Sequence, residues 1–267
     1  MLPVLPMDLM VRPATLVALD ATFALRVADP QLRHRLTEVF AALLGQPPGR
    51  HTITVEASGD GGPWLQVMVD DRPVVEASSF AGLVDAVVSP LNQAAILESG
   101  RHLLLHAAAA ELDGLAVVLP APSGSGKSTL VTRLVDAGFG YVSDEIVAID
   151  PVSLRLVPYP KPLVLDAGGS RSVVSPPLST SAVRVAAIVT PSYRPGSQGS
   201  LVPVTRSEAV LMLAENSFNF HDHGAAGLRT LARLARQCEV FRLDVDDATL
   251  ATGQIRSILE DAVGHGG

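Results

Sequence analysis

Cysteine is almost absent from this chain of 267 residues, which contains only Cys238. A lone cysteine cannot form a disulfide within the chain, and its scarcity is compatible with a reducing cytoplasm. We expect Cys238 to act as a small buried apolar residue rather than as a reactive thiol. The fold must therefore be stabilised without an internal disulfide.

Long apolar runs and an excess of positive charge are absent as well. No run reaches the ~18 uninterrupted apolar residues of a membrane span. Residues 1–13 lack the basic segment and following apolar segment that mark a signal peptide. The formal charge of −7 and the isoelectric point near 5.4 argue against a general nucleic-acid or anionic-membrane surface. We therefore predict a cytoplasmic protein with neither nucleic acid nor membrane as a partner.

Apolar residues, by contrast, are plentiful: they make up 48% of the chain, and the mean hydropathy is +0.33. This content supports a sizeable core and excludes global disorder. The hydrophobicity points to buried sheet. The length suits one large domain or a small N-terminal module attached to a catalytic domain.

Residues 1–99 mix helical and strand patterns and carry no catalytic motif. The expected elements are a helix at Pro30–Leu44, a strand at His51–Val55, a hairpin at Trp64–Val75 turning at Asp70–Asp71, and a helix at Phe80–Leu97 interrupted near Pro90. We therefore predict a smaller α+β module over residues 1–99, with an accessory or substrate-presenting role.

From residue 100 to residue 267, strand and helix patterns alternate, which predicts an α/β domain. The expected strands are Leu103–Ala110, Leu115–Leu119, Tyr141–Ser143, Ile146–Ile149, Val183–Thr190 and Val240–Leu243. The expected helices are Ser128–Ala137, one from a Thr205-x-x-Glu208 capping box to Ala214, Gly224–Arg236 and Ala248–Val263. Composition predicts a flexible surface loop at Pro191–Ser200.

A loop rich in glycine and serine lies between the second of these strands and the first of these helices. Its sequence, APSGSGKS over Ala121–Ser128, matches the Walker A pattern, except that Ala121 stands where glycine is usual. Glycines let the backbone curl so that its N–H groups point at phosphate oxygens, and the helix N-terminus adds its positive end. The flanking strand and helix disfavour the alternative of an ordinary Gly/Ser turn. We therefore predict that the chain binds a nucleoside triphosphate through Ser123, Gly124, Ser125, Gly126, Lys127, Ser128 and Thr129.

An acidic pair, Asp144-Glu145, follows 17 residues after Lys127. We expect Lys127 to reach the β- and γ-phosphates and the Ser128 hydroxyl to ligate Mg²⁺. Carboxylates at the carboxyl edge of an α/β sheet face the ligand crevice. One of the pair could hold Mg²⁺ and the other could accept a proton from an attacking hydroxyl. The alternative is a solvated turn.

The string SGSGKSTL is shared with ABC-type ATPases, which makes that class the first alternative. In those proteins the second acidic motif arrives roughly a hundred residues later and follows an LSGGQ-like signature. Nothing of the kind occurs between Val189 and Gly267. The chain is therefore a poor fit to that class.

From Gly100 onward the chain resembles the catalytic domain of HPr kinase/phosphorylase, and more closely the HPr-kinase-related proteins. The resemblance rests on the histidine of LLLHAAAAELDG, the loop APSGSGKSTL and the stretch LVDAGFGYVSDEIVAID. It implies a P-loop kinase domain of the HPr kinase/PEP carboxykinase-like type. It also implies that Lys127 and Ser128 bind phosphates and Mg²⁺, and that Asp144 deprotonates an acceptor serine. Glu145 would assist the metal, and His106 would lie beside Asp144 and tune it.

The segments PYPKPL, PSYRPGSQGS and ENSFNF also resemble the related kinases, a group that includes kinases acting on lasso-peptide precursors. Two departures stand out: HPr kinases carry two aspartates where this chain has Asp144-Glu145, and their glycine-rich signature with a further metal-binding glutamate has no counterpart.

The resemblance implies a kinase that uses ATP and Mg²⁺ to phosphorylate a serine hydroxyl of a peptide or protein. A kinase acting on a small metabolite and a nucleotide-gated binding module without transfer are the alternatives. HPr kinases assemble into rings, so a homo-oligomer is a further expectation.

Several other residues are candidates whose role the sequence leaves open. Lys161 could line the phosphate end of the site or be an exposed loop charge, and Asn216 and Asn219 could bear on the site. Arginines that could stabilise transferred charge, or lie on the surface, are Arg171, Arg194 and Arg206. His221-Asp222-His223 has too few neighbouring ligands for zinc and reads as a polar loop or a lid near the nucleotide.

Overall fold

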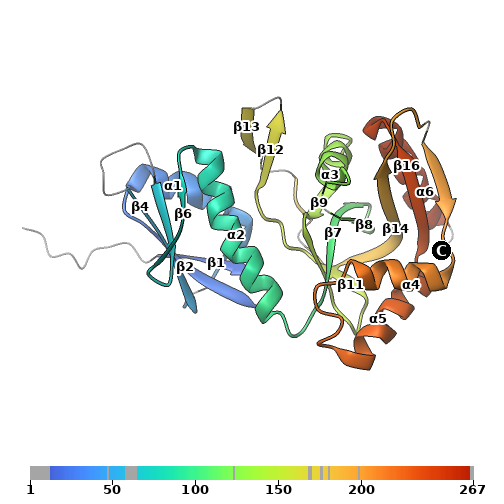
Figure 1. Cartoon of the computed structure of the whole chain (residues 1–267), viewed down its shortest axis with the longest axis horizontal. Helices are drawn as coiled ribbons and strands as arrows, with labels where there is room; N and C mark the ends of the chain where they lie inside the picture. Colours follow the sequence, from blue (N-terminus) through green and yellow to red (C-terminus); the bar gives the residue numbers. More distant parts are fainter. Residues whose placement is uncertain are drawn as a thin grey trace, which may run out of the picture.

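The computed structural model describes residues 13–46, 48–57, 65–122, 124–167, 170–174, 177–179, 181–197 and 199–264. In this part of the chain the protein is a mixed α/β protein, with a six-stranded sheet, an eight-stranded sheet and a separate two-stranded hairpin (Figure 1). The α/β class expected from the alternation of strand and helix patterns is confirmed.

The six-stranded sheet is formed by the N-terminal part of the chain, in the order β3-β1-β2-β4-β5-β6. Its strands are β1 (Ala14–Ala18), β2 (Ala21–Val27), β3 (Leu44–Gly45), β4 (His51–Ala57), β5 (Leu65–Val69) and β6 (Arg72–Ala77). The predicted turn between β5 and β6 is confirmed, because Asp70 and Asp71 both have positive φ angles, 48° and 62°. Trp64, expected in this hairpin, lies outside the described residues.

The first predicted helix is shorter than expected. Helix α1 (Pro30–Val39) begins after Asp29, whose carboxylate accepts a hydrogen bond from the Leu32 amide at 2.7 Å. A 3₁₀ turn, η2 (Ala41–Leu43), then replaces the last predicted turn and leads into β3. Phe40 and Leu43 are nevertheless buried, so the apolar stripe is kept while the backbone changes direction.

Helix α2 (Phe80–Glu98) runs through Pro90 without a break, so the expected interruption is wrong. Proline removes one helical hydrogen bond and clashes with the preceding turn. Burial offsets this cost, because Pro90 is buried together with Val87, Val88 and Leu91. The helix packs on the six-stranded sheet and shares a core with Leu104, Ile146 and Tyr159 of the second half of the chain.

Among the described residues, α2 is also the one helix long and apolar enough to cross a membrane, and 56% of its apolar window is buried. A helix that is apolar on nearly all sides is expected where protein covers more than one of its faces. The packing of α2 between two parts of the fold accounts for its composition.

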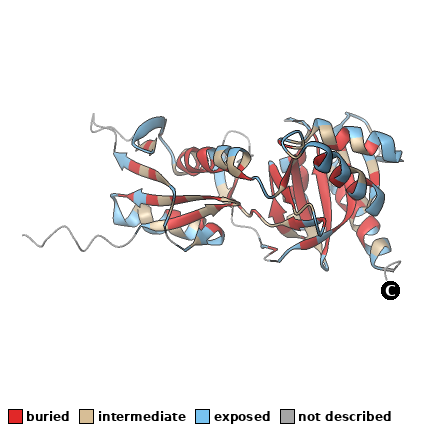
Figure 2. Ribbon diagram, turned by 90° about the horizontal axis from the view of Figure 1, so that it is seen from below, coloured by how far each residue is buried: buried red, intermediate tan, exposed pale blue. Residues whose placement is uncertain are grey.

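The eight-stranded sheet follows the order β11-β10-β7-β8-β14-β16-β15, with β9 paired to β7. Its strands are β7 (Leu103–Leu112), β8 (Leu115–Pro120), β9 (Gly140–Ser143), β10 (Ile146–Ile149), β11 (Arg155–Val157), β14 (Val183–Tyr193), β15 (Ser200–Pro203) and β16 (Glu239–Val245). Helices α3 (Lys127–Asp136) and α6 (Ala248–Gly264) cover one face, and α4 (Arg206–Glu215) and α5 (Gly224–Gln237) cover the other. Strands β7, β8 and β14 at the centre of this sheet are mostly buried (Figure 2).

The predicted helices of this half are confirmed to within two residues at each end, including the capping box at Thr205 and Glu208. The surface loop predicted at Pro191–Ser200 is wrong at its start. Pro191–Tyr193 continue β14 because they pair in parallel with Leu243–Val245 of β16. A hairpin formed by β12 (Leu163–Ala167) and β13 (Ser170–Val174) was not predicted.

Strand direction brings several chain segments to one edge of the eight-stranded sheet. Strand β14 is parallel to β8 and to β16, and β8 and β9 are both antiparallel to β7. The carboxyl ends of β8, β9, β14 and β16 therefore point the same way. Strands β9 and β10 pair with successive parts of β7, with Ser143 opposite Ala109 and Ile146 opposite His106. The two residues at the break between β9 and β10 are Asp144 and Glu145.

Candidate functional site

The glycine-rich loop lies between the end of β8 and the start of α3. Gly124 and Gly126 have φ angles of 81° and 90°, which residues with a Cβ rarely adopt. Ala121 is buried and does not have a positive φ, so alanine fits where the Walker A pattern usually has glycine. Ser123 lies outside the described residues. The glycines thus shape the loop through backbone conformation, as predicted for an anion cradle.

Lys127 is the first residue of α3 and is only 6% exposed. Its ammonium donates hydrogen bonds to the carbonyls of Ala121 and Pro122, the latter at 2.8 Å. Burial lowers the pKa of Lys127, and the charges of Asp144 and Glu145 oppose this shift. The ammonium therefore lies against the loop that precedes it, at the positive end of a helix.

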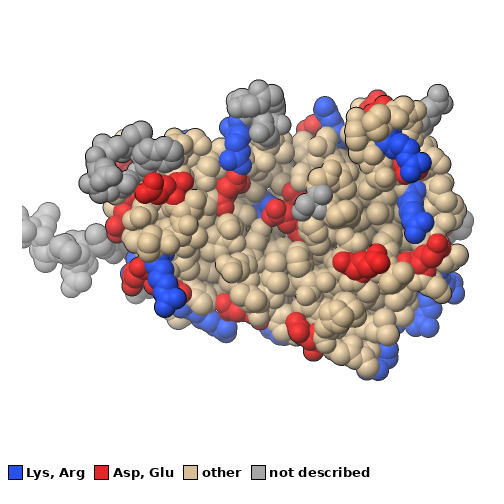
Figure 3. All heavy atoms as spheres, viewed as in Figure 1, with Lys and Arg blue, Asp and Glu red and all other residues tan. Residues whose placement is uncertain are grey.

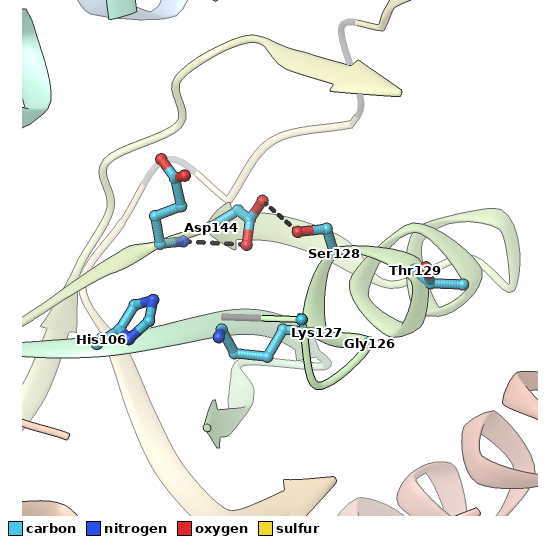
Figure 4. Close-up of a pocket in the computed structure, with 8 residues that line it drawn as sticks. His106, Gly126, Lys127, Ser128, Thr129 and Asp144 are labelled. Carbon is cyan, nitrogen blue, oxygen red and sulfur yellow. Dashed lines mark hydrogen bonds between the residues drawn. The ribbon is translucent and has the colours of Figure 1, made fainter. Parts of the chain in front are cut away.

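Asp144 is 5% exposed and faces the first turn of α3. Its Oδ2 accepts a hydrogen bond from the Ser128 hydroxyl at 3.1 Å, and its Oδ1 accepts one from the Glu145 amide at 3.0 Å (Figure 4). Figure 4 also shows His106 and Lys127 on the same side of the loop, whereas Thr129 lies farther along α3. The hydroxyl and carboxylate oxygens of Ser128 and Asp144 are ligands that Mg²⁺ prefers.

Glu145 has a φ angle of 71°, an uncommon conformation for a glutamate. Its Oε2 accepts a hydrogen bond from the Asn92 amide of α2 at 2.7 Å and lies 3.4 Å from the Lys161 ammonium. The side-chain oxygen of Asn92 in turn accepts a hydrogen bond from the Tyr159 hydroxyl at 3.0 Å. Within the pair, the carboxylate nearer to Ser128 is thus that of Asp144, while Glu145 is engaged with α2 and Lys161.

His106 lies on β7, just beyond the point where β8 ends at Pro120. Its backbone amide donates to the Asn216 carbonyl at 2.6 Å, and its ring contacts Phe218. Burial lowers the pKa of His106, and the nearby Lys127 ammonium lowers it further against the charges of Glu145 and Asp144. The imidazole is therefore neutral near pH 7 and can accept or donate a hydrogen bond in the site.

These side chains surround a cavity of about 330 Å³, which we call the loop cavity. It is lined by His106, Gly124, Gly126, Lys127, Ser128, Thr129, Asp144 and Glu145. All the predicted catalytic and metal-binding residues lie here. Of the remaining predicted nucleotide-binding residues, Ser125 lies on the other side of the loop, where it lines a different cavity.

A second cavity, of about 440 Å³, lies between α2 and the chain around Pro162, and we call it the α2 cavity. It shares Ser128, Asp144 and Glu145 with the loop cavity. The residues it adds include Ser89 and Asn92 from α2 and Lys161 and Leu163 from the opposite side. Figure 3 shows acidic and basic side chains meeting in a hollow near the centre of this face of the molecule. The acidic pair thus borders two cavities at once.

The other basic candidates are spread apart. Lys161 is 6% exposed and lines the α2 cavity, so of its two alternatives the exposed loop charge is wrong. Arg171 also lines the α2 cavity and pairs with Asp85 of α2. Arg194 pairs with Asp244 at 3.1 Å. Arg206, exposed at the start of α4, lines neither cavity.

The side chains of the two asparagine candidates form hydrogen bonds with backbone groups and do not line the loop cavity. The buried Asn219 side chain accepts from the Leu104 amide at 2.8 Å and donates to the carbonyls of Ser99 and His102. These bonds fix the entry to β7. The Asn216 side chain donates to the Met212 carbonyl at the end of α4. Asn219 thus holds the backbone of β7 at Leu104, and the backbone carbonyl of Asn216 holds it at His106.

His221-Asp222-His223 forms the turn before α5. The His221 ring packs against Phe220, and His223 lies 3.1 Å from the His102 carbonyl. In the described part of the chain, no three side chains of His, Cys, Asp or Glu come together as a metal-binding group. Burial raises the pKa of Cys238 to about 12, which favours the protonated thiol, and the residue is half-buried rather than buried as predicted.

Sequence reasoning missed the contribution of α2 to the site. Asn92 is one of several polar residues in a mainly apolar helix and lies next to Gln93, so no local signal singles it out. The chain also contains only two lysines, Lys127 and Lys161, and both are buried at this site. Lysine is rarely buried without a partner or a function. The scarcity of lysine was therefore a usable signal.

The lowered pKa of His106 predicts a dependence of stability on pH. Its folded-state pKa lies below the value of about 6.5 in the unfolded chain, so the unfolded chain binds the proton first on acidification. The free energy of unfolding should therefore fall as pH decreases from about 6.5 through the lowered pKa. We expect His106→Gln to make this decline shallower in urea unfolding measured between about pH 7.5 and pH 5.

His51 provides a control of opposite sign. Hydrogen bonds to Asp70 and Glu98 raise its pKa, so its stabilising contribution is present below about pH 6.5 and is lost as pH rises through the raised value. His51→Gln should make the decline on acidification steeper. Parallel profiles for wild type and His106→Gln would contradict the lowered pKa of the half-buried His106.

The loop, the acidic pair and His106 thus come from three separate segments that the sheet brings to one edge. Their geometry defines a candidate anion-binding and proton-accepting site. In comparisons with known proteins, no family model matches the chain, and no curated protein matches it.

Proposed function

We propose that this chain is a Mg²⁺- and ATP-dependent kinase that transfers the γ-phosphoryl group to a serine hydroxyl of a peptide or protein. The observation that carries the proposal is the position of Asp144, which borders both the loop cavity and the α2 cavity. A phosphoryl donor in the first cavity and an acceptor hydroxyl in the second would meet at this carboxylate. Transfer between two bound substrates requires such an arrangement.

The donor side is supported by the glycine-rich loop and by Lys127. Backbone N–H groups of the loop and of the first turn of α3 would bind phosphate oxygens, and the ammonium would compensate their charge. These features support a P-loop, and we propose that residues 100–267 have a P-loop kinase fold of the HPr kinase/PEP carboxykinase-like type.

Magnesium fits the oxygen ligands beside the loop. Ser128 and Asp144 would hold it, because their side-chain oxygens are 3.1 Å apart at the start of α3. When bound, the ion neutralises the charge that develops on the phosphate oxygens. Glu145, which the resemblance gave as the second metal ligand, would have to leave Asn92 and Lys161 to reach the same position.

In the reaction, the acceptor oxygen forms a bond with the γ-phosphorus while the bond from that phosphorus to the oxygen it shares with the β-phosphate breaks. ADP leaves with the electrons of that bond. The hydroxyl proton passes to Asp144, whose carboxylate is held by Ser128 and the Glu145 amide. Neutral His106, in the same cavity, orients the reacting groups without adding a positive charge.

The hairpin of β12 and β13 favours a peptide as the acceptor. Leu163 and Val164 of β12 line the α2 cavity, and within the described residues no third strand pairs with this hairpin. An extended peptide can add to an unpaired strand edge through main-chain hydrogen bonds. Such a peptide would place a serine side chain near Asp144.

The size of the α2 cavity favours a second candidate, a kinase for a small metabolite. Its volume of about 440 Å³ lies in the range of ordinary small-molecule sites. A nucleotide-gated binding module without transfer is the third candidate. All three would function in the cytoplasm.

One experiment separates these candidates. The protein is incubated with Mg²⁺ and γ-labelled ATP, together with either a library of serine-containing peptides or a panel of hydroxylated metabolites, and labelled product and ADP are measured. We expect labelled peptide, at a level that Lys127→Ala does not reach. Labelled metabolite alone would favour the second candidate. ATP binding with no turnover above the Lys127→Ala control would overturn the kinase proposal.

A further inference from the structure

A third cavity, of about 290 Å³, lies on the side of the glycine-rich loop that faces away from Lys127, between α3 and the ends of β14 and β16. We call it the β16 cavity. One wall is the loop with Thr129 and Leu130, and the other is formed by Pro191 and Tyr193 of β14 with Val245 and Asp246 at the end of β16. These walls are mainly apolar, unlike those of the other two cavities. Ligands of α/β sheets bind outside the carboxyl ends of the strands, where this cavity lies.

The three cavities are neighbours that share lining residues. The loop cavity shares Ser128, Asp144 and Glu145 with the α2 cavity on one side. On the other side it shares Gly124, Gly126 and Thr129 with the β16 cavity. A ligand whose charged end lies beside Lys127 and Asp144 can therefore extend past Thr129 into the β16 cavity.

Tyr193 gives this cavity an exposed aromatic surface. Its side chain is 62% exposed, in a chain of which aromatic residues make up only 4%. The backbone of Tyr193 is fixed by pairing with Val245 of β16. The nearby Asp246 carboxylate raises the pKa of the Tyr193 hydroxyl, so the hydroxyl stays protonated at the edge of the cavity. An aromatic ring held in an open cavity is a stacking surface for a planar group.

Polar groups in the β16 cavity are few and placed at its edge. Asp246 Oδ2 accepts a hydrogen bond from the Gly196 amide at 2.8 Å, so the carboxylate is held in place by the loop after β14. A carboxylate has further acceptor sites for hydroxyl or amino groups. On the opposite wall, the buried Ser125 hydroxyl finds no hydrogen-bond partner among the described residues. An apolar cavity with a few fixed polar groups is typical of small-molecule sites.

We propose that the β16 cavity binds the base and ribose of the nucleoside triphosphate, with the base stacked on Tyr193 and hydroxyl or amino groups of the nucleoside donating to Asp246. This inference rests on the proposed function, because it assumes that the triphosphate lies in the loop cavity. The base then lies on the far side of the phosphates from the α2 cavity. Donor and acceptor approach Asp144 from opposite directions.

The proposal is tested by comparing ATP with inorganic tripolyphosphate, which has the same chain of phosphates but no nucleoside. Their dissociation constants are measured by calorimetry with Mg²⁺ for the whole chain and for Tyr193→Ala, Tyr193→Phe and Asp246→Asn. Leu228→Ala, an exposed apolar residue of α5, is the matched control. Retained binding of tripolyphosphate shows that each variant is folded.

We expect Tyr193→Ala to weaken ATP binding about tenfold and Tyr193→Phe to retain most of the affinity, because the ring is kept. Asp246→Asn should weaken ATP binding severalfold. Tripolyphosphate binding should be the same in all variants, and Leu228→Ala should match the wild type for both ligands.

Two other outcomes overturn the proposal, in distinguishable ways. If wild type binds ATP no more tightly than tripolyphosphate, or if Tyr193→Ala leaves ATP binding unchanged, the nucleoside binds elsewhere and the proposed kinase activity still stands. If wild type binds neither ligand, the assignment of the loop cavity to phosphates fails, and the proposed function fails with it.

Discussion

Replacing Asp144 by asparagine should reduce the rate of phosphoryl transfer by about 10²- to 10⁴-fold, the usual contribution of a positioned general base. Asparagine has nearly the same shape and can still accept the hydrogen bond from Ser128, so the start of α3 should stay in place. The variant loses the negative charge that accepts the proton. The rate is measured as transfer from γ-labelled ATP, at saturating Mg²⁺, to the acceptor found in the screen.

Glu145→Gln is the matched control, because it removes the same charge one residue along the chain. Glu145 is engaged with Asn92 and Lys161 rather than with Ser128, so we expect this variant to transfer at least about tenfold faster than Asp144→Asn. A rate for Asp144→Asn within twofold of wild type would remove Asp144 as the base. Equal losses in both variants, together with a higher Mg²⁺ requirement for Glu145→Gln, would assign the metal to Glu145.

Replacing Lys127 by alanine should lower the transfer rate by about 10²- to 10³-fold, as expected when one preorganised charge beside the transferred group is removed. The Lys127 ammonium is buried at the N-terminus of α3, where few other positive charges reach the loop cavity. We also expect weaker binding of ATP and of tripolyphosphate, because both place phosphates beside this group. Calorimetry and the transfer assay measure the two effects separately.

Lys161→Ala is the control for this substitution. It removes the other buried lysine, whose ammonium faces Glu145 in the α2 cavity rather than the loop. Binding of ATP should be preserved in Lys161→Ala, whereas use of the acceptor should be impaired. Equal affinity of wild type and Lys127→Ala for both ATP and tripolyphosphate would contradict the assignment of the loop cavity to phosphates.

Local patterns in the sequence predict the donor side of the site because its residues are close in the chain. The loop, the first turn of α3 and the acidic pair all lie within Ala121–Glu145, and each follows a strand whose direction the alternation of elements predicts. His106 joins them because β7 is the antiparallel neighbour of β8. The directions of the two acidic side chains could not be predicted, because the positive φ of Glu145 has no signature in the sequence.

The remainder of the site depends on contacts between distant segments. Asn92 reaches Glu145 across 53 positions of the chain, and nothing in the pattern of α2 indicates which side of the helix meets the second sheet. The continuation of α2 through Pro90 was not predicted for a similar reason. Local propensity favours a break at proline, but the core formed with Leu104, Ile146 and Tyr159 holds the helix on both sides.

The burial of both lysines has a practical consequence for chemistry on the folded protein. Reagents that acylate or alkylate amines normally modify many surface lysines, but this chain has none beyond Lys127 and Lys161. Apart from the N-terminal amine, every amine of the folded protein lies in a cavity beside Asp144 or Glu145. An amine-directed label therefore reports on access to the site itself, with almost no background from the surface.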